Sequence, residues 1–280
     1  MKKISRRSFL AAAGLTVAAL ALTACGGSAS TASSAAASSV AASSEAASTS
    51  AAAAELTTVE AGKLTMATNA TFPPYEMTTD SGEIEGIDVD TAKAIAEKLG
   101  LELQIDDMDF DAALLSVQQG KADIVMAGVT VTDERKAVMD FSDSYATGIQ
   151  SIIVPEGSDI TSPDDLAGKK IGTQRGTTGY IYCSDDFGDD AVVAYDDGLT
   201  AVQALKNGQV DAVVIDNAPA KEFVAANPGL VILDTSYAEE DYAIGLAKGS
   251  ALEDAVNAAL EELKADGTLQ SIVDKYITAE

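Results

Sequence analysis

The arrangement of apolar residues divides the chain, from about residue 60 onward, into alternating strands and helices. Continuous apolar runs bounded by glycines, such as 122–127 between Gly120 and Gly128, predict buried strands. Apolar residues spaced by three and four positions, as over 89–99, predict helices with one buried face. Because the two patterns alternate, we predict an α/β protein whose strands pair largely in parallel.

The same pattern sets the expected limits of individual elements. Asp88 is predicted to be the N-cap of the helix over 89–99, and Asp109 that of a helix over 110–117. Residues 69–76, which contain two adjacent prolines, are predicted to form a loop. Further strands are expected at 63–68, 101–105, 151–154, 170–173 and 242–247, and closing helices at 253–266 and 269–276. Of these, the strand at 151–154 is expected to cross between two parts of the fold.

One internal repeat suggests that the fold has two lobes. Residues 115–125 and 205–214 share a helix, a glycine, an aspartate three positions later and then an apolar strand. The first strand is followed by Gly128 and Thr130, and the second by Asp216. In sheets of this kind ligands bind beyond the carboxyl ends of the strands, so each lobe is expected to supply one such loop.

The first 54 residues have a different composition from the rest. Residues 1–24 combine a basic start with a short apolar run and predict an export signal. Ser5 to Leu10 resembles a twin-arginine signal, although an ordinary Sec signal remains open. The four residues ending at Cys25 resemble a bacterial lipobox, which predicts lipid on Cys25. Residues 26–54 are almost wholly Ser, Ala and Thr, so we expect a disordered tether.

Charge and composition exclude several classes of function. The net charge of −26 argues against nucleic-acid binding, which needs clustered Lys and Arg. The chain has no histidine, which removes His-based catalysis and the commonest metal ligand. Nucleotide-binding and nucleophile-elbow motifs are also absent, so we expect no cofactor and no metal ion. With Cys25 lipidated, Cys183 is left alone, and a buried, inert thiol is favoured over a functional one.

Arg135 is the strongest candidate for chemistry. It lies in the first turn of a helix predicted over 133–139 with Thr132 as N-cap, where the helix dipole disfavours a cation. A ligand carboxylate gripped by the guanidinium would explain this position. The alternative is that Arg135 pairs with Asp133, Glu134 or Asp140 on an exposed face, and the motif alone does not choose between them.

Other predicted strand ends carry polar or aromatic residues that could line a crevice. The proline pair holds Phe72 on a stiff loop, and Phe110 begins a helix at the same edge of the sheet. Each ring could equally pack into the core. The helix start at Thr177–Thr178 offers hydroxyls and free N–H groups that suit a carboxylate.

Four short motifs together resemble one protein family. They are residues 68–76, 86–90, 127–135 and 140–145, and they occur in the order and spacing of the polar amino-acid-binding proteins of ABC importers, bacterial solute-binding proteins of the family 3 type. The likeness covers about residues 60–280. It implies a fold of two α/β lobes, each a mostly parallel sheet flanked by helices, joined by two crossing strands and closing on an amino acid.

The resemblance implies roles for residues on both lobes. Arg135 would grip the ligand carboxylate, helped by Thr130 and by Thr177–Thr178. Asp216 would take the α-ammonium together with the backbone carbonyl of Gly128. The residues themselves agree, since Arg135 and Asp216 are opposite charges on the loops of the two repeated units, as a zwitterion requires.

The identity of the amino acid stays open. Phe72 and Phe110 would sandwich its side chain by the same resemblance. Asn69 stands where dibasic-amino-acid binders often carry Asp, which weakens the case for a strongly basic ligand, and Gly128 replaces a Ser found in some members. Glutamine, arginine and cystine-like ligands all remain possible.

We therefore expect a lipid-anchored, monomeric, non-enzymatic receptor on the outer face of the cell membrane that delivers a polar amino acid to an ABC permease. The alternative is an enzyme on the same fold, similar to the cyclohexadienyl and arogenate dehydratases. The expected divisions are a signal peptide at 1–24, a lipidated N-terminus and tether at 25–59, a first lobe at 60–147 and 243–280, and a second lobe at 148–242.

Overall fold

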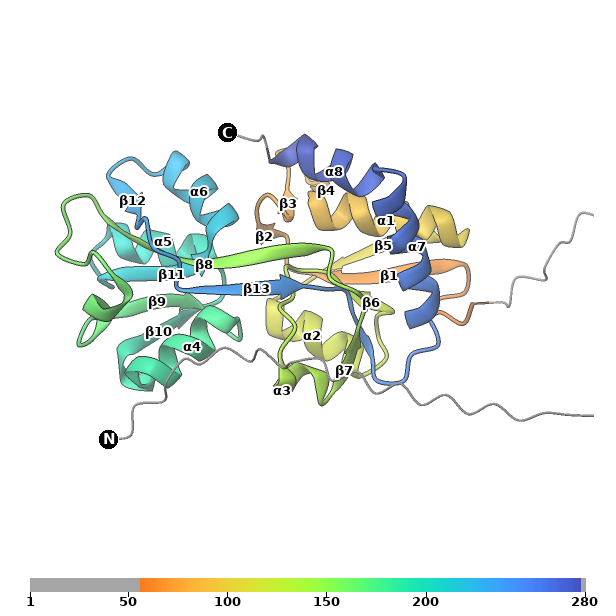
Figure 1. Cartoon of the computed structure of the whole chain (residues 1–280), viewed down its shortest axis with the longest axis horizontal. Helices are drawn as coiled ribbons and strands as arrows, with labels where there is room; N and C mark the ends of the chain where they lie inside the picture. Colours follow the sequence, from red (N-terminus) through yellow and green to blue (C-terminus); the bar gives the residue numbers. More distant parts are fainter. Residues whose placement is uncertain (1–55, 278–280) are drawn as a thin grey trace, which may run out of the picture. The chain divides into compact units, whose positions relative to one another are not determined.

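The computed structural model describes residues 56–277. The predicted export signal, Cys25 and most of the predicted tether lie outside the described residues. The described part is built around two larger sheets and one small one (Figure 1).

In the first sheet four strands run in one direction and one strand, β14, runs in the opposite direction. Its order is β5 (Glu102–Asp107), β1 (Lys63–Thr68), β6 (Ile124–Val125), β14 (Gly245–Ala247) and β7 (Met139–Phe141). β1 runs parallel to β5 and β6, whereas β14 is antiparallel to β6 and β7. The β1 side chains alternate between the faces, so Leu64 and Met66 join one apolar cluster and Ala67 joins another.

Helices cover both faces of this sheet. α1 (Ile87–Leu99) packs with α7 (Glu253–Ala265) and α8 (Thr268–Tyr276), while α2 (Phe110–Gln118) packs on β1 and β14. α3 (Asp133–Lys136) leads directly toward β7. The helix predicted over 133–139 is thus shorter than expected, because Met139 already belongs to a strand.

The second sheet has the same plan. Its order is β10 (Val192–Tyr195), β9 (Ile171–Gln174), β11 (Ala212–Asp216), β8 (Ala146–Pro155) and β12 (Leu230–Ile232), and β13 (Ala238–Tyr242) also pairs with β8. β9 is parallel to β10 and β11, and the pairs made by β8 are antiparallel. α4 (Thr178–Phe187) shares one cluster with this sheet, and α5 (Gly198–Lys206) and α6 (Asn217–Ala226) share another. Two short 3₁₀ turns, η1 (Pro163–Leu166) and η2 (Asp189–Ala191), complete this part.

β8 and β13 run side by side between the two sheets (Figure 1). The crossing strand predicted at 151–154 is therefore longer, at Ala146–Pro155. The strand predicted at 242–247 is divided: β13 ends at Tyr242, and β14 begins at Gly245 in the other sheet. The chain thus passes from one sheet to the other twice, as the two-lobed fold requires.

Two other local predictions need correction. Residues 69–76, predicted as loop, contain β2 (Thr71–Phe72) and the start of β3 (Glu76–Thr78), which form the small sheet with β4 (Ile84–Glu85). Asp88 is not the N-cap of α1, because the helix begins at Ile87 and Gly86 occupies the cap position with φ 141°. A Cβ on Gly86 would overlap the backbone carbonyl of Tyr75, so only glycine fits there.

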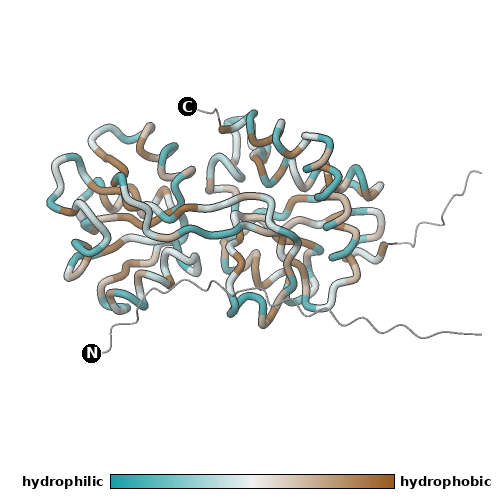
Figure 2. Tube along the Cα trace, in the orientation of Figure 1, coloured by the Kyte–Doolittle hydropathy of each residue, from teal (hydrophilic) through white to brown (hydrophobic). Residues whose placement is uncertain are grey.

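The internal repeat corresponds to a repeated structural device. Asp123, before β6, accepts the N–H of Thr65 at 2.8 Å, and Asp211, before β11, accepts the N–H of Lys170 at 2.8 Å. Each aspartate ties the start of its own strand to the neighbouring strand. Hydrophobic positions alternate with hydrophilic ones along the helices, whereas the crossing strand β13 is largely hydrophilic (Figure 2).

Candidate functional site

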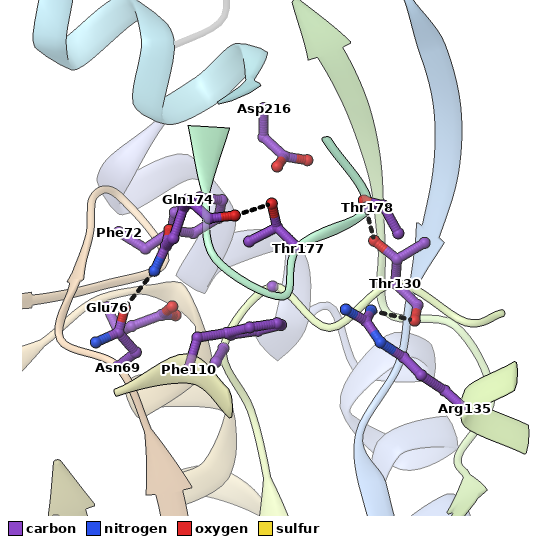
Figure 3. A pocket seen from close by; sticks show the side chains of 12 residues that line it. Asn69, Phe72, Glu76, Phe110, Thr130, Arg135, Gln174, Thr177, Thr178 and Asp216 are labelled. Atoms are coloured by element: carbon purple, nitrogen blue, oxygen red, sulfur yellow. Dashed lines mark hydrogen bonds between the residues drawn. The ribbon is translucent and has the colours of Figure 1, made fainter. Parts of the chain in front are cut away.

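A narrow cavity lies where strand ends of the two sheets meet (Figure 3). All nine residues proposed from the sequence as ligand contacts line it, together with Ala127, Glu76 and Gln174. The nine are Asn69, Phe72, Phe110, Gly128, Thr130, Arg135, Thr177, Thr178 and Asp216. The structure therefore brings the predicted set together, and their binding roles stay predictions.

Strand ends place most of these side chains. Asn69 follows β1, Gly128 follows β6 after two further residues, and Gln174 and Asp216 are the last residues of β9 and β11. Because these strands are parallel within each sheet, their carboxyl ends open on one edge. Phe110 reaches the same edge as the first residue of α2.

Arg135 is buried, with 9 % of its surface exposed. Its Nη1 donates to the carbonyl of Thr130 at 2.8 Å and its Nη2 to the carbonyl of Gly176 at 3.2 Å. The guanidinium carbon lies 5.3 Å from the centre of the Phe110 ring. Among the described residues no carboxylate forms an ion pair with it, so the alternative of surface pairing with Asp133, Glu134 or Asp140 does not hold.

Burial lowers the pKa of Arg135 from its usual value, and the charges of Glu240 and Asp216 act in the opposite direction. An arginine side chain nevertheless stays protonated in a protein. The site therefore holds a buried cation that is hydrogen-bonded only through neutral carbonyls. Such a cation favours an anionic ligand.

Thr130 and Thr178 are linked by an acid that sequence analysis did not select. Glu240, on β13, accepts hydrogen bonds at its Oε2 from Thr130 Oγ1 at 3.1 Å and Thr178 Oγ1 at 3.0 Å. Gln150 Nε2 donates to the same oxygen at 3.0 Å. Glu240 is one of three consecutive acids, and only strand alternation distinguishes it, since its neighbours Glu239 and Asp241 are exposed.

Asp216 is the acid of the second sheet. It is buried, and its carboxylate accepts hydrogen bonds from Gln150 Nε2 at 2.8 Å and from the hydroxyl of Tyr242. Burial raises the pKa of Asp216 to about 7, and the nearby charge of Glu240 adds to this, whereas the two hydrogen bonds oppose it. A carboxylate has four acceptor positions, so Asp216 retains capacity for a cationic donor.

Two aromatic rings flank the cavity. Phe72 packs beside Tyr75 with ring centres 5.9 Å apart. Gly128, at φ 55°, lets Phe72 approach, since a Cβ there would lie 2.8 Å from Phe72 Cε1. Phe110 lies under the guanidinium of Arg135. Both rings are therefore cavity walls, and both also belong to the apolar clusters.

The end of the cavity near β1 is rich in acceptors. Gln174 Nε2 donates to Asn69 Oδ1 at 2.8 Å, and Asn69 Nδ2 donates to the carbonyl of Met108 at 3.0 Å. Glu76 is fully buried behind them and points into the cavity (Figure 3). It closes one of the four motifs quoted above, and its place after Pro-Pro-Tyr is the signal that could have identified it.

Several of these contacts join the two sheets directly. The bond from Arg135 to Gly176 and the bond from Gln174 to Asn69 each connect a loop of the first sheet with a loop of the second. A Cβ on Gly176 would also overlap Asp111, which shows how closely the loops approach. The structure is therefore a closed arrangement around the cavity.

Comparison with known proteins places the chain in a family. Residues 64–279 match the model of the bacterial extracellular solute-binding proteins, family 3. The chain belongs to this family. Its fold of two α/β parts agrees with the predicted architecture, and membership confirms the prediction of a solute-binding protein rather than an enzyme.

Individual relatives within the family are similar over most of their length. The L-cystine-binding protein TcyJ of Escherichia coli K12 is 34 % identical over 226 residues, 79 % of this chain and 85 % of the relative. The arginine-binding extracellular protein ArtP of Bacillus subtilis 168 is 34 % identical over 230 residues, 78 % of this chain and 87 % of the relative. A solved structure of an ancestral arginine-binding protein bound to glutamine is 43 % identical with a TM-score of 0.74, covering 78 % of this chain and 99 % of that one.

Within residues 56–277, no helix has the length and apolar character needed to span a membrane. No group of acidic or thiol side chains in that range has the geometry of a metal site. Cys183 lies fully buried in α4, and burial raises the pKa of its thiol to about 12.

Proposed function

We propose that this chain is the receptor of an ABC importer for a free amino acid, which it binds between its two lobes. The observation that carries the proposal is the pair formed by Arg135 and Asp216. Both are buried, they have opposite charges, they lie on different sides of one cavity, and they come from loops of the two different sheets (Figure 3). An α-carboxylate and an α-ammonium on one small molecule match both.

The ligand carboxylate has a defined place in this proposal. Arg135 and Thr130 both line the cavity, and the N–H of Thr130 has no backbone acceptor among the described residues. A carboxylate there would receive charge-assisted hydrogen bonds from a guanidinium and an amide. Because Arg135 and the loop of Thr177 belong to different sheets, the same bonds would stabilise the closed arrangement.

The side-chain end of the cavity favours a donor-rich ligand. Asn69 and Gln174 offer amide oxygens, and Glu76 offers a carboxyl group. A guanidinium or a carboxamide has the donors to satisfy these groups. The relatives include proteins named for arginine, cystine and glutamine, and one arginine-binding relative is bound to glutamine. We therefore favour arginine, with glutamine next, over a cystine-like ligand.

The test is thermal unfolding of the chain from residue 25 onward, with Cys25→Ser to prevent lipidation, against each of the twenty amino acids and cystine. The protein is first unfolded and refolded to remove bound ligand. A ligand at a hundred times its dissociation constant adds about 2.7 kcal/mol of stability. For a protein of this size that raises the melting temperature by roughly 2–4 °C per kcal/mol. No shift with any of these compounds would contradict the proposal.

In transport the chain would have two further partners, the cell membrane and an ABC permease. We infer that a lipid on Cys25 holds the chain at the outer face of the membrane and that the closed form delivers its ligand to a permease. The inferred tether, residues 25–59, would keep the binding unit, acting as a monomer, near the membrane. Mass spectrometry of the mature chain from the native host should find a diacylated or triacylated Cys25. An unmodified N-terminus at that residue would refute the anchor and leave the binding role intact.

A further inference from the structure

Two buried acids lie together at the side-chain end of the cavity. Glu76 is in β3 and lines the cavity, and Asp88 is in the first turn of α1; both are fully buried. Neither oxygen of Glu76 receives a hydrogen bond from a donor among the described residues, and neither does Oδ1 of Asp88. Oδ2 of Asp88 accepts the N–H of Gly128 at 3.0 Å. Three of the four carboxyl oxygens therefore have no donor at hydrogen-bonding distance and angle, although the Tyr145 hydroxyl lies near Asp88.

Among the described residues, no cation acts on either acid. The titratable groups that act on Glu76 or surround the pair come from α1, β5, β11 and the segments around β3 and β7, and all are acids or phenols. They are Tyr75, Asp88, Asp107, Tyr145 and Asp216. Two neighbouring buried carboxylates without a cation are costly, and such a pair lowers its energy by holding one proton between them.

The hydrogen-bonding pattern gives the proton a location. Burial, followed by the charge of Asp88, holds the pKa of Glu76 well above its usual range. Burial also raises the pKa of Asp88 to about 6, and hydrogen bonding to the Gly128 N–H, the Tyr145 hydroxyl and the Glu76 carboxyl opposes this. At neutral pH the pair is thus a neutral Glu76 carboxyl that donates to the Asp88 carboxylate, with a total charge of −1.

We propose that the Glu76–Asp88 pair discriminates between cationic and neutral ligand side chains by releasing or keeping its shared proton. The inference rests on the proposed function and concerns the same cavity. A neutral side chain leaves the proton on Glu76, whose carbonyl oxygen then accepts a hydrogen bond from the ligand. A guanidinium replaces the proton: the Glu76 proton passes to the solvent, two guanidinium N–H groups donate to the carboxylate, and the pair then carries −2.

Arginine and citrulline provide a matched pair of probes. They have the same length, and citrulline carries a neutral urea group where arginine carries a guanidinium. Any proton that Asp216 releases to the solvent when the α-ammonium binds is released with both ligands. The ratio of the two dissociation constants therefore cancels Asp216 and reports only on the side-chain end.

The experiment is isothermal titration calorimetry of the full mature chain in buffers of different ionisation enthalpy, from pH 5.5 to 8. The number of protons released is obtained from the dependence of the binding enthalpy on the buffer. We expect arginine to release up to one proton more than citrulline. Below the pKa of the pair, the preference for arginine should rise about tenfold per pH unit. Equal proton counts and a ratio independent of pH would overturn the inference.

Variants separate the proton from other effects of the site. Glu76→Gln should abolish the extra proton and weaken arginine binding about a hundredfold, while citrulline binding changes only a few-fold. Glu83→Gln, the same substitution at an exposed position of the same segment, should leave both ligands unchanged. Asp88→Asn removes the neighbouring charge, so the pH at which selectivity changes should fall by at least one unit. Were a variant not to fold, the proton count of the unaltered chain would still decide.

The two proposals fail differently. If neither arginine nor citrulline binds, the proposed ligand class is wrong and this inference falls with it. If both bind with equal proton release, the receptor stands and the Glu76–Asp88 pair is only a buried structural feature.

Discussion

Arg135 illustrates how a functional residue departs from local helix rules. Thr132 caps α3 by accepting the N–H of Arg135 at 3.2 Å, as the sequence predicts, yet the side chain places a cation beside the positive end of the same helix. Two carbonyls and the face of Phe110 hold the guanidinium there. This environment fixes its direction without neutralising its charge, so an incoming anion meets a rigid, unpaired fork.

Arg135→Lys keeps the charge but removes the fork, and we expect ligand affinity to fall roughly 30-fold to 100-fold, since a charge-assisted hydrogen bond contributes about 1.5–3 kcal/mol. Calorimetric titration with the amino acid found in the thermal screen measures the loss. Arg175→Lys is the matched control, because Arg175 is exposed and pairs with Asp196. Affinity within threefold of the unaltered chain would remove Arg135 from the site.

The sequence located the charged and aromatic ligand candidates but missed three polar groups. Arg135 and Asp216 were identifiable because each follows a repeated strand and has an unusual local setting. Glu76, Gln174 and Glu240 were not selected, because a buried acid or amide resembles a surface one in sequence and only the motif position of Glu76 and the strand alternation at Glu240 distinguish them. Their burial depends on contacts between segments far apart in the chain, as with Gln174 and Asn69.

At the scale of elements, hydrophobic periodicity predicted most helices well and misplaced several boundaries. The closing helices expected at 253–266 and 269–276 are α7, Glu253–Ala265, and α8, Thr268–Tyr276. The start of α1 was misjudged because the Asp88 carboxylate is used by the N–H of Gly128 and not by its own helix. The division at Tyr242 was missed because an apolar run is uninterrupted when a strand leaves one sheet and joins another.

The loop between β9 and α4 controls how closely the lobes approach. Gly176 has φ 73°, and a Cβ there would overlap the carboxyl group of Asp111. Gly176→Ala should therefore impede closure and weaken ligand binding about tenfold or more, because closing would require Asp111, at the start of α2, to move. Small-angle scattering with saturating ligand should show a larger radius of gyration than for the unaltered chain.

Gly100→Ala is the control for that substitution. Gly100 is left-handed with a similar φ of 70°, but a Cβ there would meet nothing within 4 Å. The strain of a left-handed alanine is thus matched, and only the contact with the other lobe differs. Equal affinities for the two variants would show that the approach of Gly176 to Asp111 does not matter for closure.

At the scale of the molecule, the two crossing strands connect binding to shape. β8 contributes Gln150, and β13 contributes Glu240 and Tyr242, to the hydrogen bonds around Thr130, Thr178 and Asp216. A change in the charge of this network is therefore felt by the segments about which the lobes would move. The internal repeat suggested two lobes and the family resemblance implied them, whereas this polar connection through the crossing strands could not be predicted from residue types.

The buried acids also predict how the stability of the ligand-free protein depends on pH. In the folded state the pKa of Asp216 is raised to about 7 and that of Asp88 to about 6, from an ordinary value of 3.8. Between pH 4 and 7 the folded state thus binds more protons than the unfolded state. Their contribution is fully present below pH 4 and is lost as the pH rises through the folded values, by about 1.4 kcal/mol per pH unit for each titrating group.

Acids whose pKa is lowered in the folded state contribute to stability over a different pH range. Asp140, for example, has its pKa lowered by Lys248, so its contribution is already complete above about pH 4. We therefore expect the free energy of unfolding, measured with urea, to be higher at pH 5 than at pH 7.5. Asp216→Asn should flatten this slope, whereas the exposed Asp143→Asn should not. A bound amino acid should also flatten it, since its α-ammonium would favour the charged form of Asp216; a slope unchanged by both the substitution and the ligand would show that Asp216 is not the titrating group.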